Sequence, residues 1–128
     1  MKKQKIYSGA PWEKTVSYCR AIRVGDHIFV SGTTSINESG EIIGIGDVYQ
    51  QAKFIFNKIE NVLHELDSSL EDIVRTRTFI TDMNNFEGFS KAHGECFSGI
   101  DPAATCVEVS GFVDKNLLIE IEVDAIIM

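Results

Sequence analysis

Carboxylates and arginines on strand-like segments are the side chains of this sequence best suited to chemistry on a small molecule. From Leu117 to Ile127 apolar and polar residues alternate, which places Glu120, Glu122 and Asp124 on one side of a predicted strand. A carboxylate can accept and return protons, and an arginine guanidinium is a natural grip for a carboxylate. The arginines gather in two short stretches, around Arg20 and around Arg77, so a local basic cleft is compatible with this sequence.

The other reactive side chains favour packing over nucleophilic or metal chemistry. Cys19, Cys96 and Cys106 show no CxxC spacing and are odd in number, which predicts neither a disulfide framework nor a zinc site. The GIGDVY segment lacks the third glycine of a dinucleotide fingerprint, so we expect no cofactor there. Ser31 has no neighbouring His and Asp in the sequence, and we expect it to donate hydrogen bonds rather than act as a nucleophile.

Period-two alternation predicts the strands that position these residues. The segment Ser17–Val24, the turn Gly25-Asp26 and the run HIFVSG predict a β-hairpin. The stretch from Ile73 to Thr81 predicts another strand, with Arg75, Arg77, Phe79 and Thr81 on one side and Val74, Thr76, Thr78 and Ile80 on the other. Two final strands are predicted over residues 104–109 and 117–127, and we expect Cys106 to face the same side as Glu120.

Two amphipathic helices are predicted between the strands. Asp47 is a helix cap, and apolar residues recur after it at three- and four-residue steps as far as Leu66. Asn84-Asn85 opens a second helix that ends before the loop SGIDP. These helices can cover one face of the sheet, and the rest of the chain offers nothing to cover the other. The polar face therefore needs water or another subunit.

Bulk composition narrows the class of protein. At 128 residues the chain suits one domain, residues 1–128, and 44% hydrophobic with 24% charged residues is typical of globular proteins. The net charge of -7 makes nucleic acid an unfavourable partner, because a phosphate backbone attracts basic clusters. No apolar run approaches the roughly 20 residues that span a bilayer, so we expect no membrane partner and a cytoplasmic location.

Four motifs, taken together, resemble the YjgF/RidA family across nearly the whole chain. They are YCRAIRVGDHIFVSGTT, LEDIVRTRTFITDMNNF, DPAATCVEV and LIEIEVDA. The resemblance implies an α+β fold of the chorismate-mutase-like type, with a mixed sheet backed by two helices on one face. It also implies a homotrimer whose sheets face inward, with clefts between subunits. That assembly agrees with the uncovered polar face.

The resemblance implies a deaminase type of activity. Family deaminases hydrolyse reactive enamines and imines, such as 2-aminoacrylate, to a keto acid and ammonia, and the family's arginine grips the substrate carboxylate. Ala104 stands at the matching position here, so the usual cation is absent. In this sequence Glu120 matches the acid associated with the attacking water, and Tyr18, Ser31 and Cys106 match other cleft residues.

Three further cleft positions depart from the family pattern. Thr33 stands where many members have glutamine, Ser90 where many have asparagine, and His93 where an aromatic residue is common. These departures are similar to those of a divergent subgroup. His93 also lies on the helical apolar stripe, which favours a packed histidine near the rim of the cleft over a general base.

Another arginine could replace the lost one. Arg20 is two residues from Tyr18 on the predicted strand and would share its face, and Arg77 is the second candidate. Alternatively, the arginines and acids form an ion-pair network that sets subunit register. Both interpretations remain open from the sequence.

The sequence therefore supports three functions of different classes. The leading hypothesis is a RidA-like protein that binds, and in the enzymatic case hydrolyses, a small imine, enamine or carbonyl metabolite in clefts between trimer subunits. The alternatives are a non-catalytic metabolite-binding or regulatory trimer and, less favoured by the acidic charge, an endoribonuclease.

Overall fold

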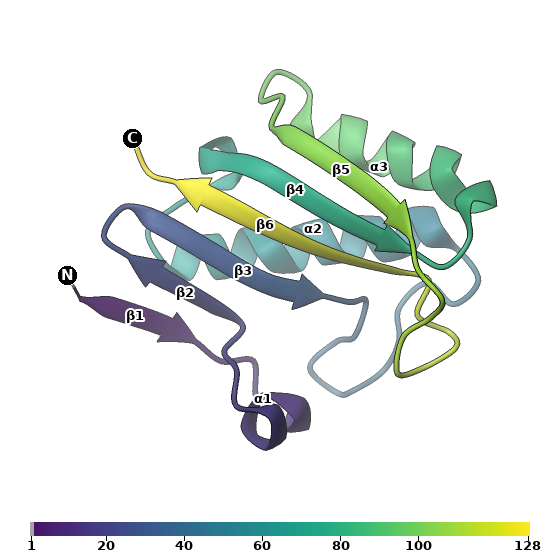
Figure 1. The fold of residues 1–128 in the computed structure, drawn as a ribbon, viewed down its shortest axis with the longest axis horizontal. Helices are drawn as coiled ribbons and strands as arrows, with labels where there is room; N and C mark the ends of the chain where they lie inside the picture. Colours follow the sequence, from purple (N-terminus) through teal and green to yellow (C-terminus); the bar gives the residue numbers. More distant parts are fainter. Residues whose placement is uncertain (1) are drawn as a thin grey trace.

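The computed structural model describes residues 2–128 and arranges them as one mixed sheet with its two long helices on the same side (Figure 1). The elements are β1 (Lys3–Ile6), α1 (Pro11–Val16), β2 (Ala21–Val24), β3 (His27–Thr33), α2 (Val48–Glu65), β4 (Ile73–Ile80), α3 (Phe86–Phe97), β5 (Ala103–Glu108) and β6 (Ile119–Ile126), with 3₁₀ turns at Leu70–Asp72 and Met83–Asn85. The strand order is β1-β2-β3-β6-β4-β5; β4 and β5 pair in parallel and the other neighbours pair antiparallel. This confirms the predicted α+β architecture.

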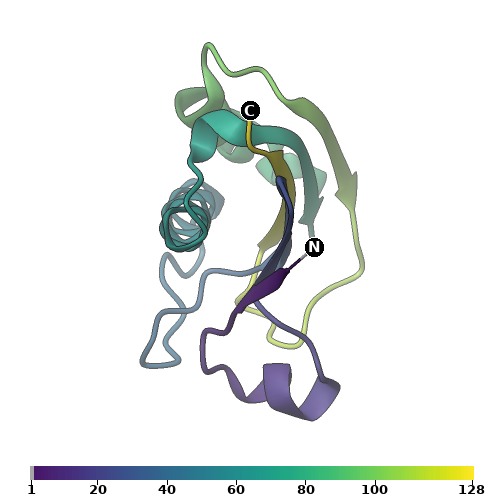
Figure 2. The ribbon, with the colours of Figure 1, turned by 90° about the vertical axis from the view of Figure 1, so that its left-hand side faces the viewer.

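Both long helices form where the apolar periodicity predicts them. The Asp47 side chain accepts a hydrogen bond from the Gln50 backbone at the start of α2, and Ile55, Ile59 and Leu63 are fully buried along one face. The helix α3 packs beside α2, and Figure 2 shows the two helices in one layer behind the sheet. No helix within residues 2–128 is long and apolar enough to span a membrane.

The central strand β6 separates the core from the open face. Its residues alternate without exception between buried and half-buried, from Ile119 to Ile126. Ile121 and its alternate neighbours lie in the core under the helices, while Glu120, Glu122 and Asp124 lie on the face that no helix covers. The predicted division of this strand into an apolar and an acidic side is confirmed.

The N-terminal part differs from the prediction. Residues before Ala21 do not form the predicted strand; Pro11–Val16 form the short helix α1, and Ser17 ends it with φ 73°, in the left-handed region. Proline in the first turn favours a helix start because it has no N–H to satisfy there. An additional strand, β1, pairs with β2 at the sheet edge. The alternation of apolar and polar residues from 17 to 20 therefore does not correspond to a strand.

Two irregularities shift side chains from one face of the sheet to the other. The pairing of β3 with β6 slips between Val30 and Thr33, and that of β4 with β6 slips between Ile73 and Arg75. Because of the second slip, Ile73 is buried while Val74 is 42% exposed, which reverses the predicted position of Val74. The first slip has consequences for the candidate site.

Candidate functional site

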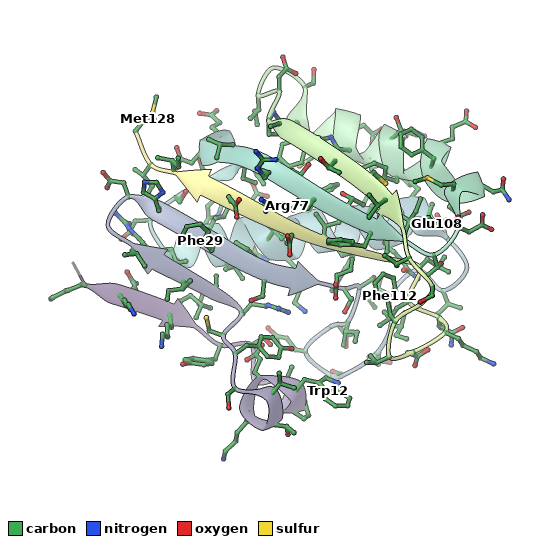
Figure 3. The ribbon with its side chains drawn as sticks, viewed as in Figure 1. Trp12, Phe29, Arg77, Glu108, Phe112 and Met128 are labelled. Carbon is green, nitrogen blue, oxygen red and sulfur yellow. The ribbon has the colours of Figure 1, made fainter. Side chains whose placement is uncertain are left out.

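A cavity of about 710 Å³ lies at one end of the sheet. Its walls come from the segment around α1, the loop after β3 and the loop between β5 and β6, and its polar lining includes Tyr18, Arg20, Lys58 and Glu120. Figure 3 shows Trp12 on α1 and Phe112 on the β5–β6 loop at this end of the molecule. The cavity therefore combines an apolar wall with a charged floor.

Glu120 faces this cavity from β6. It lies against Gly32, where an added Cβ would stand 2.8 Å from the Glu120 carboxyl carbon, so only glycine leaves this room. The slip in β3 places Gly32 on the Glu120 side and Thr33 on the core side. Burial raises the pKa of the Glu120 carboxyl above its ordinary value, the Arg20 charge opposes that rise, and the Glu122 charge adds to it.

Arg20 is buried beside Glu120 and is only 6% exposed. Its Nη2 donates to the Gly32 carbonyl at 2.8 Å, whereas its Nε is buried with no hydrogen-bond partner in residues 2–128. The guanidinium carbon lies 5.7 Å from the centre of the Tyr18 ring. The predicted closeness of Tyr18 and Arg20 is confirmed, although its cause is the turn after α1 and not strand alternation.

A buried carboxylate fixes that turn. Glu13 of α1 is 5% exposed and accepts hydrogen bonds from the Ser8 backbone and hydroxyl. The backbone N–H groups of Ser17 and Tyr18 both donate to the Glu13 carbonyl. Glu13 therefore ties the segment before α1 to the segment that carries Tyr18.

Arg77 lies on the open face, away from this cavity's lining (Figure 3). Its Nη1 is 3.4 Å from the Glu122 carboxylate and 3.2 Å from that of Asp124. These three residues form the ion-pair arrangement that the sequence left open as the alternative for the arginines. Arg20 forms no salt bridge within residues 2–128, so the structure separates the two arginines by environment.

The remaining predicted site residues of the β3 segment have internal hydrogen bonds. The Ser31 hydroxyl donates to the Cys19 carbonyl at 2.8 Å, as the predicted hydrogen-bonding role requires. The Thr33 hydroxyl donates to the Ser31 carbonyl, and Thr33 is 1% exposed beside Ile121 on the core side. Thr33 therefore does not line the cavity.

Cys106, His93 and Ser90 lie on the helix side of the sheet. Cys106 pairs with Thr78, which is buried under the helices, so its predicted placement on the Glu120 face is wrong. Burial raises the pKa of its thiol, which disfavours the nucleophilic thiolate. Ser90 is exposed on α3, far from the lining of the Glu120 cavity.

His93 is a packed histidine, as its place on the apolar stripe predicts. Its Nε2 lies 2.9 Å from the Thr76 hydroxyl, and its ring contacts those of Phe56, Phe89 and Phe97. Burial lowers the pKa of His93 below its ordinary value and so favours the neutral ring.

The sequence interpretation missed Lys58 and the cavity wall at Phe112. Lys58 follows Ile55 by three residues and precedes Val62 by four, so it is a charged residue within the apolar stripe of α2. A charged residue within an apolar stripe was the sequence signal that could have identified Lys58. No sequence signal identified Phe112, because its place depends on the path of the β5–β6 loop. Within residues 2–128 no group of three metal-ligating side chains comes together.

Known proteins share the sequence pattern and the fold of this chain. The family profile described as Endoribonuclease L-PSP matches residues 9–127. A RutC family protein of Pyrococcus abyssi is 36% identical over 123 residues, which cover 95% of each chain. The crystal structure of a Mycobacterium tuberculosis member of the YjgF/YER057c/UK114 family is similar with a TM-score of 0.89 and 32% identity, covering 98% of this chain and 100% of that one.

A second solved structure extends the likeness. The Yersinia pestis protein YyfA, described as a protein of unknown function of the conserved Rid family, has a TM-score of 0.84 and 30% identity over 98% of this chain and 100% of its own. Sequence, fold and the profile match over most of the chain agree, and the chain therefore belongs to the YjgF/RidA family.

Proposed function

We propose that this protein hydrolyses a small imine or enamine metabolite in the Glu120 cavity. The observation that carries the proposal is the environment of Glu120: a half-buried carboxyl of raised pKa that lies against Gly32 in a ligand-sized cavity. A carboxyl whose pKa moves towards neutrality is suited to take and return a proton at physiological pH. Membership of the YjgF/RidA family supports this choice of chemistry.

The reaction needs one base and one water. Glu120 removes a proton from water as the oxygen attacks the carbon of the C=N bond, and it passes that proton to the nitrogen to give a neutral carbinolamine. Glu120 then takes the proton of the carbinolamine hydroxyl and delivers it to the amine as the C–N bond breaks and the C=O bond forms, so ammonia leaves and Glu120 ends as the carboxylate it began as. An enamine first gains a proton on carbon to become the imine. The net change is addition of one water and loss of one ammonia.

The proposal includes a homotrimer with the cavity at an interface between subunits. It is supported by the sheet face that carries Arg77, which no element within residues 2–128 covers and which exposes large apolar side chains. Phe29 on this face is 46% exposed and Val107 is 41% exposed. A second and third copy of the chain would cover these side chains and narrow the mouth of the cavity.

The first test is hydrolysis of a panel of imines generated in place by an amino-acid or amine oxidase and followed by semicarbazide trapping. The protein should lower the rate at which the semicarbazone forms, because it hydrolyses the imine before semicarbazide traps it. Glu120→Gln should reduce the hydrolysis rate roughly a hundredfold or more, because an amide cannot transfer the proton. Glu71→Gln changes an exposed acid in a 3₁₀ turn and serves as the matched control with an unchanged rate.

The other outcomes distinguish the alternative functions. Ligand binding to the Glu120 cavity without hydrolysis of any imine would establish the non-catalytic binding protein. RNA cleavage that copurifies with the protein and disappears in Glu120→Gln would establish the endoribonuclease, against the expectation from the net charge of -7.

A further inference from the structure

Two cations with no carboxylate partner stand side by side in the cavity floor. Arg20 and Lys58 both line the Glu120 cavity and also a second hollow of about 570 Å³ on the other side, between α2 and the segment before α1. No carboxylate within residues 2–128 lies within salt-bridge distance of either side chain. The pair therefore divides two hollows and is reachable from them.

Each cation is held by one backbone carbonyl and keeps further donors unused. The Lys58 ammonium donates to the Ile36 carbonyl at 3.0 Å, and the Arg20 Nη2 donates to the Gly32 carbonyl at 2.8 Å. A guanidinium has five N–H donors and an ammonium has three, so most of their hydrogen-bonding capacity is unsatisfied within the chain. The unpartnered, buried Nε of Arg20 is the clearest sign.

The acids nearby do not neutralise the pair. Glu13 is engaged by the Ser8 backbone and hydroxyl, and Glu38 is exposed on the loop that lines both hollows. Burial, and next to it the Arg20 charge, hold the pKa of Lys58 below its ordinary value, whereas Glu13 raises it. Two like charges held close together in a half-buried site favour an anion between or beside them.

We propose that Arg20 and Lys58 form a binding site for the carboxylate of an organic acid whose apolar body lies along the wall of Trp12, Phe112 and Val113. The wall follows from the lining of the cavity, where these side chains face the charged floor. Both cations come from the same chain and supply the grip that Ala104 cannot. The inference rests on the proposed function only in identifying this acid with the substrate.

Calorimetric titration with three probes tests the head and the body of this ligand separately. α-Ketoisocaproate carries the carboxylate and a branched apolar chain. Methyl isobutyl ketone has the same apolar chain with a methyl group in place of the carboxylate. Pyruvate has the carboxylate, but only a methyl group in place of the apolar chain. α-Ketoisocaproate should bind most tightly of the three. If the ketone binds equally well, the carboxylate site is wrong; if pyruvate binds equally well, the apolar wall is wrong.

Lys58→Met keeps most of the side-chain length and removes the charge. It should weaken α-ketoisocaproate binding at least about tenfold, the effect expected for a lost hydrogen bond to a charged group, and should leave ketone binding unchanged. Lys58→Arg should restore the acid's affinity to within a few-fold, which a purely structural lysine would not require. Lys53→Met, which removes an exposed lysine of the same helix, is the matched control.

Glu120→Gln separates this inference from the proposed function. It should abolish imine hydrolysis and keep or strengthen α-ketoisocaproate binding, because it removes a negative charge near Arg20. Unchanged acid binding in Lys58→Met would overturn the carboxylate site even where hydrolysis is confirmed. Absent hydrolysis with Lys58-dependent acid binding would overturn the deaminase and leave the site standing.

Discussion

Glu120 and Arg20 show how burial changes the properties of residue types that usually lie at the surface. Glu120 loses solvation at the cavity floor, and the one arginine near it is already turned towards the Gly32 carbonyl. A direct bidentate ion pair would lower the pKa of the carboxyl and make it a weak base. The hydrogen bond of Arg20 to the Gly32 carbonyl instead leaves Glu120 available as a base.

The raised pKa of Glu120 predicts a stability change with a defined sign. A carboxyl whose pKa is raised in the folded state binds its proton more tightly there, so the folded state loses stability as pH rises past the unfolded pKa, whose ordinary value is 4.5. Glu120→Gln removes this ionisation. The variant should therefore melt at a higher temperature than the parent at pH 7, with a difference that shrinks as the pH falls below 4.5.

Differential scanning calorimetry across this pH range measures the effect. Glu71→Gln, which changes an exposed acid, is measured alongside as the control. A parent protein that is more stable than Glu120→Gln at neutral pH would contradict the burial of an uncompensated carboxyl.

At the scale of elements, the slip in β3 connects the sheet to the site. It moves Gly32 to the cavity side and leaves the carboxyl of Glu120 in the space that any larger residue would occupy. Figures 1 and 2 show that this part of β3 lies at the end of the sheet nearest α1. The position of the Glu120 carboxyl, the proposed acid, thus depends on a backbone irregularity in the neighbouring strand.

Gly32→Ala should damage activity more than stability. The added methyl would displace the far end of a flexible side chain, which costs little in folding, but a shift of about 1 Å in the acid lowers the rate roughly tenfold to a hundredfold. Urea unfolding and the imine assay measure the two effects. Gly94→Ala is the control, since no atom lies within 4 Å of its added methyl and alanine favours a helix. Full activity in Gly32→Ala would exclude Glu120 as the base in its present position.

The elements with strong apolar periodicity could be predicted from the sequence. Segments with weak periodicity and edge strands could not be placed correctly. The helix α2, the strands β4 and β6, and the side of β6 that carries Glu120 followed from the apolar periodicity of the sequence. Cys106 was misplaced because β5 is an edge strand with little burial, so its alternation does not say which side is the core. Phe112 was missed because its place in the cavity wall depends on a loop whose path periodicity does not encode, whereas Lys58 had a signal in its position within the apolar stripe of α2.

At the scale of the whole molecule, the two faces of the sheet differ in how they are covered. One is filled by α2 and α3, and the other exposes Phe29 and the Arg77 ion pairs to solvent in a single chain (Figure 3). Arg77 offsets one of the two negative charges of Glu122 and Asp124, which lowers the electrostatic cost of bringing copies together. The proposed trimer accounts for both features.

Phe29→Glu should convert the trimer to monomers, because it would bury an unpaired carboxylate at the interface between copies. Sedimentation velocity measures the change in mass. Phe86→Glu alters a phenylalanine of nearly equal exposure, 45% against 46%, on the helix side, and should leave the assembly intact. A monomeric parent, or dissociation by Phe86→Glu alone, would contradict assembly through the open face.

The segment before β2, here called the arm, forms one wall of the cavity and can change in sequence with little effect on the rest of the fold. This arm is joined to the rest by the pairing of β1 with β2 and by hydrogen bonds from Ser31 to the carbonyls of Arg20 and Cys19, and of its described residues only Ile6 packs against the main core. The hydrogen bonds around Glu13 hold the arm together internally. Substitutions at Trp12 or Val16 thus reshape the cavity with little disturbance of the α2–sheet interior. Ligand preference can diverge through substitutions in this arm while the α2–sheet core and Glu120 on β6 stay unchanged.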